Sequence, residues 1–220
     1  LPSPPYPDGL YAFNVTSPGS LDNEETLSLE AGYSGKLNDN VMFRADAYYQ
    51  RYDDLIGYRK TYDGFGIPYH IADNIDGADA WGGEMELSCQ GKNGTLSAWY
   101  AYNDFQEDTS QQGVRGYLPA QHKAGITGRL RLGRGWVLNA NYRYASTMRV
   151  LNLDTTIADT RPSDRFDLSL AKEIGDGRGE WMVGVSDLFN ETNGPHYAIG
   201  RLSAHETPGR TFFTRLQLSF

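Results

Sequence analysis

Histidine, serine and carboxylate side chains are the groups in this sequence that could support metal binding or hydrolysis. The four histidines, His70, His122, His196 and His205, are too far apart for spacings such as His-x-x-x-His, which place two ligands on one metal ion. Serine, histidine and aspartate all occur, but no Gly-x-Ser-x-Gly turn is present to expose a nucleophilic serine. We therefore expect no enzymatic activity, no resident metal and no cofactor.

Acidic residues gather around the segment from Asp53 to Ile71, where paired carboxylates could transfer protons or bind calcium. They are Asp53, Asp54, Asp73, Asp76 and Asp79. Their spacing does not match that of a calcium-binding EF-hand loop. We interpret them as a hydrated external surface.

Aromatic and cationic residues share the same segment and suit the capture of an aromatic or anionic chelate. The candidate ligand-binding residues are Tyr58, Arg59, Tyr62, Phe65 and Tyr69. The alternative, that these side chains only pack loops against each other, stays open. His70 and His196 could contact a metal-laden ligand from external loops, or could simply be solvated.

Composition excludes several classes of protein. Hydrophobic residues make up 39% of the 220 residues and mean hydropathy is -0.56. No run approaches the roughly 18 to 20 apolar residues of a membrane-spanning helix, which excludes a helical membrane protein. The net charge of -8, with scattered basic residues, argues against nucleic-acid binding, and the single Cys89 allows no internal disulfide. The start at Leu1, without methionine or signal segment, suggests a fragment of a longer chain.

Two-residue alternation of apolar and polar side chains recurs along the chain and predicts an all-β protein. About nine segments show it: 26–33, 41–50, 84–89, 96–103, 124–132, 136–144, 166–173, 181–186 and 212–220. In each of these segments one face would be apolar and the other polar.

Short and long connections alternate between these segments. The short ones are Asn38 to Asn40, Gly91 to Gly94, Gly133 to Gly135 and Gly175 to Gly179, and the long ones are Asp53 to Ile71, Glu107 to Gln121, Arg149 to Pro162 and Glu191 to Gly209. An antiparallel up-and-down sheet then has all its short turns at one end, as in bacterial outer-membrane β-barrels. We assign 1–23 to an external loop and 24–220 to barrel strands. A soluble β-sandwich, which would fold in water without detergent, is the alternative.

Charged residues on the apolar face lie near strand ends, where the cost of facing lipid is small. They are Lys172, Asp187 and His122. Aromatic residues are expected at two levels, as in the girdles of membrane barrels. Trp136, Trp181 and Phe220 lie toward the short turns, and Tyr49, Tyr102, Tyr144 and Phe166 toward the long loops. Ordinary cross-strand aromatic pairs would be the soluble alternative.

The C-terminal segment from Glu206 to Phe220 resembles the last strand of TonB-dependent receptors, with a Pro-Gly-Arg start and a terminal Phe. The segment from Val183 to Asn190 resembles their penultimate strand, with Asp187 in place of the usual Asn. Three further stretches match in the family's order. They are Leu21 to Tyr33, Asn74 to Glu86, and Pro119 to Lys123.

The resemblance implies that the chain is the C-terminal part of a barrel of about 22 strands in the bacterial outer membrane. An N-terminal plug and the missing strands would precede Leu1. Such receptors import scarce nutrients, for example a ferric siderophore, cobalamin, haem, another metal complex or a glycan, with energy relayed through the TonB complex. The barrel-assembly machinery would recognise Leu216, Leu218 and Phe220. A passive porin and an outer-membrane hydrolase are the alternatives.

Overall fold

The computed structural model describes residues 15–16, 19–62, 64–66, 68–74, 77–107, 113–114, 117–151, 157–159, 161–175, 178–190 and 209–218. All regular secondary structure in these residues is β-strand. They contain no helix that is long and apolar enough to cross a membrane.

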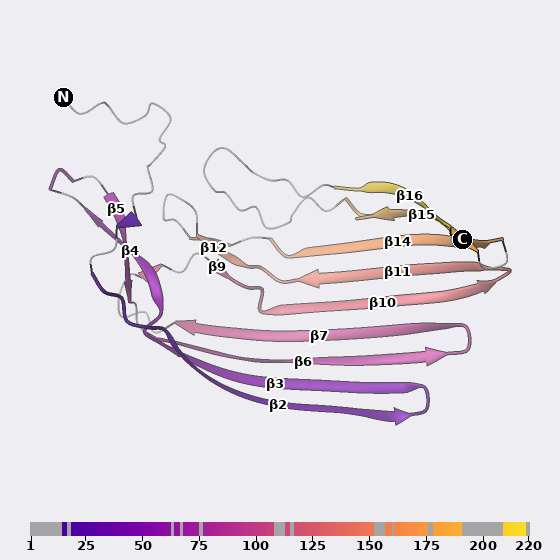
Figure 1. The fold of residues 1–220 in the computed structure, drawn as a ribbon, viewed down its shortest axis with the longest axis horizontal. Coiled ribbons are helices and arrows are strands. Elements are labelled where there is room, and N and C mark those ends of the chain that lie inside the picture. Colours follow the sequence, from indigo (N-terminus) through magenta and orange to yellow (C-terminus); the bar gives the residue numbers. More distant parts are fainter. Residues whose placement is uncertain are drawn as a thin grey trace.

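One nine-stranded antiparallel sheet makes up most of the described chain (Figure 1). Its strands in spatial order are β2 (Glu25–Asn38), β3 (Val41–Asp53), β6 (Ala78–Gly91), β7 (Gly94–Glu107), β10 (His122–Gly133), β11 (Trp136–Ala145), β14 (Ser163–Ile174), β15 (Gly179–Ser186) and β16 (Thr211–Leu218). Each strand pairs with the strands before and after it in this order. The predicted all-β, antiparallel up-and-down arrangement is confirmed.

The connections between the nine strands separate by length. Short turns join β2 to β3, β6 to β7, β10 to β11 and β14 to β15, and all lie at one end of the sheet, while the long connections lie at the other (Figure 1). In the two-residue turn between β10 and β11, Arg134 and Gly135 both have positive φ, 51° and 74°. Two such residues form the type I′ turn, whose twist matches that of the flanking strands. Turn chemistry therefore fixes the register of this hairpin.

Small sheets occupy the long connections. The segment Asp53 to Ile71, which the sequence predicted as a loop, contains β4 (Ile56–Tyr62) and the first part of β5 (Pro68–Asn74). These two strands form a hairpin flanked by β1 (Val15–Thr16) and β8 (Gly113–Val114). A second sheet contains β9 (Tyr117–Leu118), β12 (Arg149–Leu151) and β13 (Ile157–Asp159). The sequence missed β1, β8, β9, β12 and β13 because each has only two or three residues, and it missed β4 and β5 because they mix polar with aromatic residues, which leaves a weak alternation.

The strand register keeps like side chains on the same face of the nine-stranded sheet. Ile126 pairs with Ala98 and Tyr142 on the apolar face, whereas the next residue, Thr127, pairs with Ser97 and Asn141 on the polar face. Thr127 Oγ1 donates a hydrogen bond to Asn141 Oδ1 at 2.9 Å. The predicted division into two faces therefore extends across neighbouring strands.

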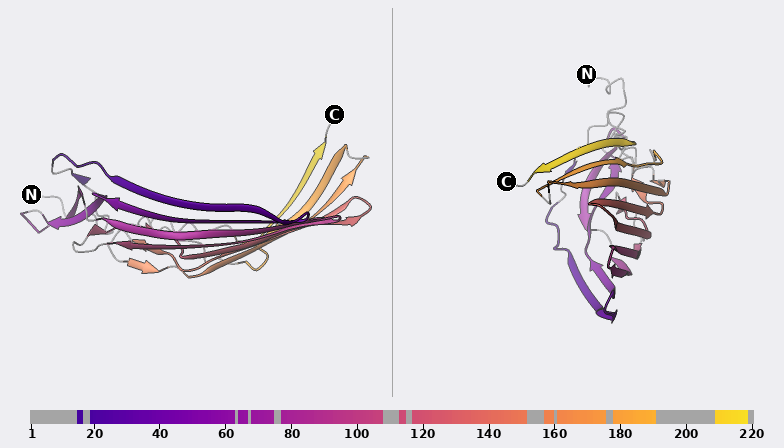
Figure 2. Two further views of the ribbon diagram at one scale, coloured as in Figure 1. Left: turned by 90° about the horizontal axis from the view of Figure 1, so that it is seen from below. Right: turned by 90° about the vertical axis from the view of Figure 1, so that its right-hand side faces the viewer.

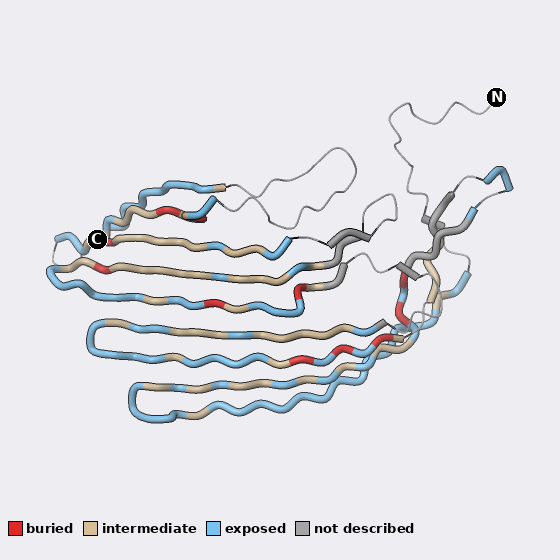
Figure 3. The backbone as a smooth tube through the Cα atoms, turned by 180° about the vertical axis from the view of Figure 1, so that it is seen from behind, coloured by how far each residue is buried: buried red, intermediate tan, exposed pale blue. Residues whose placement is uncertain are grey.

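The apolar face is exposed rather than packed into a core. Leu29 is 61% exposed, Ile126 49% and Phe212 76%. The few fully buried positions lie in short, separate pieces of the chain (Figure 3). The sheet is also strongly curved, as its end-on view shows (Figure 2). A soluble sandwich would bury this face against a second sheet, whereas a membrane barrel leaves it to lipid.

Aromatic and charged residues meet at both ends of the apolar face. At the short-turn end, the register aligns Trp136 with Lys172 and Lys172 with Trp181. At the loop end, the ring centroid of Tyr102 lies 5.2 Å from those of Trp81 and His122. These contacts agree with the two aromatic levels expected from the sequence. Phe220, assigned to the short-turn level, lies outside the described residues.

Candidate functional site

A row of paired residues crosses four strands on the polar face near the loop end, and three of its four positions carry large side chains. The register aligns Trp99 of β7 with Gly125 of β10, Gly125 with Arg143 of β11, and Arg143 with Arg165 of β14. Neighbouring strands lie about 4.8 Å apart, so the row brings an indole and two guanidinium groups to adjacent positions.

A pocket lies beside this row because the neighbouring positions carry small side chains. The next row toward the loops contains Ala101, Lys123, Ala145 and Ser163, so Lys123 stands among residues with short side chains. We call the hollow the wall pocket. It has a volume of about 290 Å³ and is lined by Trp99, Lys123, Arg143, Tyr144, Ala145, Ser163 and Arg165.

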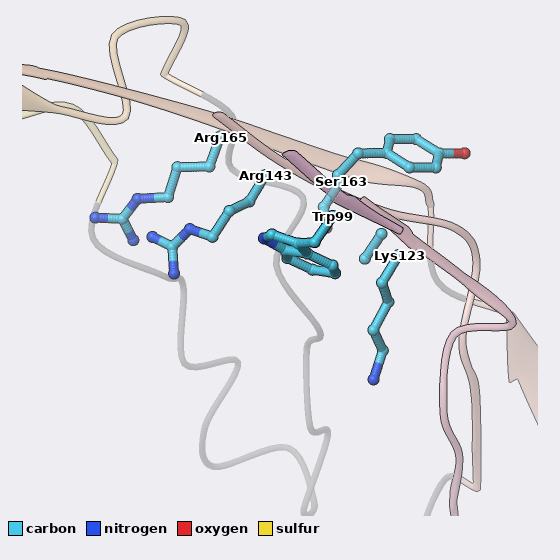
Figure 4. Close-up of a pocket in the computed structure, with 7 residues that line it drawn as sticks. Trp99, Lys123, Arg143, Ser163 and Arg165 are labelled. Atoms are coloured by element: carbon cyan, nitrogen blue, oxygen red, sulfur yellow. The ribbon is translucent and has the colours of Figure 1, made fainter. Parts of the chain in front are cut away.

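Glycine at position 125 shapes the wall pocket. A Cβ atom on Gly125 would collide with the indole ring of Trp99, so the ring lies directly over the glycine backbone. In Figure 4 the side chains of Arg165, Arg143, Trp99 and Lys123 all extend from the same side of the sheet. The aromatic ring and the three cations therefore border one space.

Asp167 holds the two arginines of the row. Its carboxylate accepts hydrogen bonds from Arg165 Nε at 2.9 Å and Arg143 Nη2 at 3.2 Å. The Ser186 hydroxyl and the Asp187 backbone N–H also donate to it, at 2.8 and 2.9 Å. One carboxylate thus orients two guanidinium groups and anchors β14 to the end of β15.

The wall pocket carries an excess of positive charge. Three cations border it and one carboxylate, Asp167, is paired with two of them. Within the described residues, Lys123 makes no side-chain hydrogen bond or ion pair. Cations together with an indole face can bind an anion that also has a flat or apolar part. No group of three or more metal-ligating side chains occurs in the part of the chain that the structure describes.

The structure brings most of the sequence-predicted ligand residues into one hairpin. Tyr58, Arg59 and Tyr62 are on β4, Phe65 is in the turn, and Tyr69 and His70 are on β5. The backbone register places His70 opposite Lys60 and Tyr62 opposite Pro68. Phe65 is 91% exposed and Tyr62 61%. His196 lies outside the described residues. The role of these residues in ligand binding stays a prediction.

Sequence analysis missed the wall pocket. Trp99, Lys123, Arg143 and Arg165 come from four strands, and the sequence analysis named none of them as a candidate ligand residue. The sequence does contain a signal for this pocket. Lys123, Arg143 and Arg165 all lie on the polar face close to a long loop, so a predicted strand register would have placed them side by side.

The residues predicted as an assembly signal are at the C-terminal edge of the sheet. Leu216 and Leu218 are on β16, on the apolar face, and are 60% and 50% exposed. Phe220 lies outside the described residues.

Comparison with solved structures finds similar folds among outer-membrane receptors. The copper transporter OprC matches with a TM-score of 0.72 at 21% identity, over 91% of this chain and 32% of that chain. The siderophore receptor PirA from Acinetobacter baumannii gives 0.68 at 14% identity, over 90% and 32%. The ferric enterobactin receptor PfeA from Pseudomonas aeruginosa, as a G324V mutant, gives 0.66 at 17% identity, over 90% and 31%. The chain thus spans about a third of the length of these proteins.

Comparison with curated protein sequences found no match. A family model does match, and it describes the β-barrel of TonB-dependent receptor-like proteins over residues 3–188, which is most of the chain. The match agrees with the meander of strands, the segregated turns and the exposed apolar face. The chain therefore belongs to the TonB-dependent receptor β-barrel family of the bacterial outer membrane.

Proposed function

We propose that the protein containing this chain is an active importer that binds an anionic metal chelate, such as a ferric siderophore, at its external mouth. The wall pocket is the observation that carries this proposal. Three cations and an indole border it on the polar face, which in a membrane barrel lines the interior. Such a surface favours a ligand with negative charge and an aromatic or apolar part.

The proposed importer also needs parts that are not in the described sheet. Residues 24–220 supply the C-terminal strands of a barrel of about 22 strands, and 1–23 belong to an external loop. A plug and a TonB-contacting segment are supplied by other parts of the protein. The barrel-assembly machinery recognises Leu216, Leu218 and Phe220 during insertion.

The hairpin of β4 and β5 would form a second part of the ligand mouth. Its aromatic residues Tyr62 and Phe65 are exposed on the side of the molecule that carries the long connections. In a bacterial barrel these connections face the outside of the cell. A chelate would meet this hairpin before it reaches the wall pocket.

Family membership favours this function over the two alternatives. The family model describes receptors, and the structurally similar proteins named above are transporters and receptors. A passive porin would admit solutes without TonB, and a hydrolase would convert a bound substrate. The importer, the porin and the hydrolase therefore predict different outcomes when binding and import are measured.

The test measures binding and import by the full-length protein. Ferric catecholate chelates with net negative charge and neutral ferric hydroxamates are compared, first by fluorescence titration of the purified receptor and then by accumulation of labelled iron in cells. Replacing two of the three cations in the variant Lys123→Gln/Arg143→Gln should weaken binding of the anionic chelate by roughly 10- to 150-fold, the value of one or two charge-assisted contacts.

Lys92→Gln is the matched control because Lys92 lies in a short turn at the opposite end of the sheet. It should leave binding unchanged. Cells that lack TonB should bind the chelate without accumulating iron. Accumulation without TonB would identify a porin, and equal binding by the double variant would remove the wall pocket from the ligand site.

A further inference from the structure

A lysine between two tryptophans lies on the apolar face at the short-turn end of the sheet. The register aligns Trp136 of β11 with Lys172 of β14, and Lys172 with Trp181 of β15. We call these three residues the tryptophan–lysine row. The row faces away from the wall pocket, because its residues are on the opposite face and at the opposite end of the strands.

The side chains of this row are held in place. Lys172 Nζ lies 5.4 Å from the centre of the Trp136 ring and donates a hydrogen bond to the backbone carbonyl of Arg134 in the neighbouring turn. Trp181 Nε1 donates to Thr214 Oγ1 on β16 at 3.0 Å. The ammonium group is therefore drawn toward the turn, to the border of the apolar face, where a lysine can reach polar surroundings.

A second cationic residue, Arg134, is in the turn next to the row, and its backbone carbonyl accepts the hydrogen bond from Lys172. Arg134 is exposed, and within the described residues its guanidinium group makes no hydrogen bond or ion pair. Glu173 and Glu180, the acidic residues next to Lys172 and Trp181, alternate onto the polar face, where they are paired in register. Among the described residues of the row, the apolar face therefore carries the Lys172 ammonium group and no carboxylate.

An apolar strip continues from the row toward the middle of the sheet. Leu138, Leu170 and Val183 form the next row on the same face, followed by Ala140, Leu168 and Val185. Cations at one end and aliphatic side chains along the strands match the two parts of a phospholipid, a phosphate and an acyl chain.

We propose that the tryptophan–lysine row, together with Arg134, binds the phosphate of an anionic phospholipid, with an acyl chain along the apolar strip that begins at Leu138, Leu170 and Val183. The short turns of bacterial barrels face the periplasm, which places the lipid in the inner leaflet of the outer membrane. A phosphatidylglycerol headgroup supplies the missing negative charge. The ammonium group of phosphatidylethanolamine would be repelled by Lys172 and Arg134, so the site should select the anionic lipid.

The test is native mass spectrometry of the full-length protein released from detergent micelles that contain equal amounts of phosphatidylglycerol and phosphatidylethanolamine. The unmodified protein should retain phosphatidylglycerol preferentially. Lys172→Gln and Arg134→Gln should each reduce the retained phosphatidylglycerol about fivefold. Lys92→Gln, which changes a lysine in another short turn, should have no effect.

Two further measurements keep the result interpretable. Heat-dependent mobility on gels confirms that each variant is folded. Phosphatidylglycerol with brominated acyl chains quenches the fluorescence of nearby tryptophans. It should quench less fluorescence in Trp136→Phe than in the unmodified protein, because a nearby fluorophore is gone. Equal retention of the two lipids, or retention that Lys172→Gln does not change, would show that Lys172 only anchors the barrel at the membrane border. Chelate binding is measured in parallel, and its failure would not affect this proposal.

Discussion

The indole ring of Trp99 lies over the backbone of Gly125, its partner on the neighbouring strand, in the space that a side chain at position 125 would fill. This relationship sets the shape of the wall pocket. An aromatic ring laid over a glycine shields the backbone and presents a flat face beside Lys123 and Arg143.

Replacing Gly125 with alanine should therefore displace the Trp99 ring. We expect Gly125→Ala to shift the tryptophan emission and to weaken chelate binding several-fold, with both measured by fluorescence titration. Gly128→Ala is the control, because a Cβ atom there would meet only Leu96 Cδ1 at 3.7 Å, an ordinary contact. If both variants bind the chelate equally, the position of the indole does not matter to the ligand.

Asp167 should matter more to stability than other carboxylates of the polar face. Removal of its side chain in Asp167→Ala leaves two arginines and the Asp187 N–H without this acceptor, and should lower the free energy of unfolding by about 1–3 kcal/mol. Asp46→Ala, which breaks the more exposed pair with Arg44, should lower it by about 0.2–1 kcal/mol. Urea titration of the full-length protein in lipid vesicles gives both values. Equal losses would mean that the Asp167 contacts add no more than a surface pair.

Adjacent residues in the middle of β10 should lose different amounts of stability when each is replaced by a charged residue. Ile126→Lys places an ammonium group on the apolar face near the middle of the membrane and should cost about 2–4 kcal/mol. Thr127→Lys places the same group on the polar face, where we expect less than about 1 kcal/mol. Folding into vesicles, followed by gel mobility, compares them. A larger loss for Thr127→Lys would reverse the assignment of the two faces.

Cys89 offers a chemical test of the same assignment. It is exposed on the apolar face of β6, and its neighbour Ser88 alternates onto the polar face. In membranes, Cys89 should react with a lipid-soluble maleimide and poorly with a charged one. A cysteine at position 88, made as Ser88→Cys with Cys89→Ser, should show the opposite preference. Mass spectrometry of the labelled protein measures the ratio, and equal labelling of both positions by the charged reagent would contradict a lipid-facing Cys89.

The nine strands and their two faces were predictable because alternation is a local property of the sequence. Ile126 and Thr127 can be assigned to opposite faces from their neighbours alone. The tight turn at Arg134 and Gly135 was predictable for the same reason, since glycine favours positive φ. Such features need no knowledge of contacts between distant residues.

The wall pocket could not be predicted in this way. Trp99 and Arg165 are brought together only by the pairing of four strands, and a shift of one residue in any pairing would separate them. The hairpin of β4 and β5 was missed for a different reason, because its short strands lie inside a segment that resembles a loop. The ligand-binding role of the seven residues proposed from the sequence, from Tyr58 to His196, stays a prediction for a binding experiment.

The separation of short turns from long connections makes the sheet modular. Every hairpin, such as β6 with β7 or β10 with β11, enters and leaves at the same end of the sheet. Duplication or deletion of one whole hairpin would change the circumference by two strands and reverse the direction of no other strand. Evolution can therefore widen or narrow a barrel of this kind by two strands at a time, which keeps the strand number even, as bacterial barrels require.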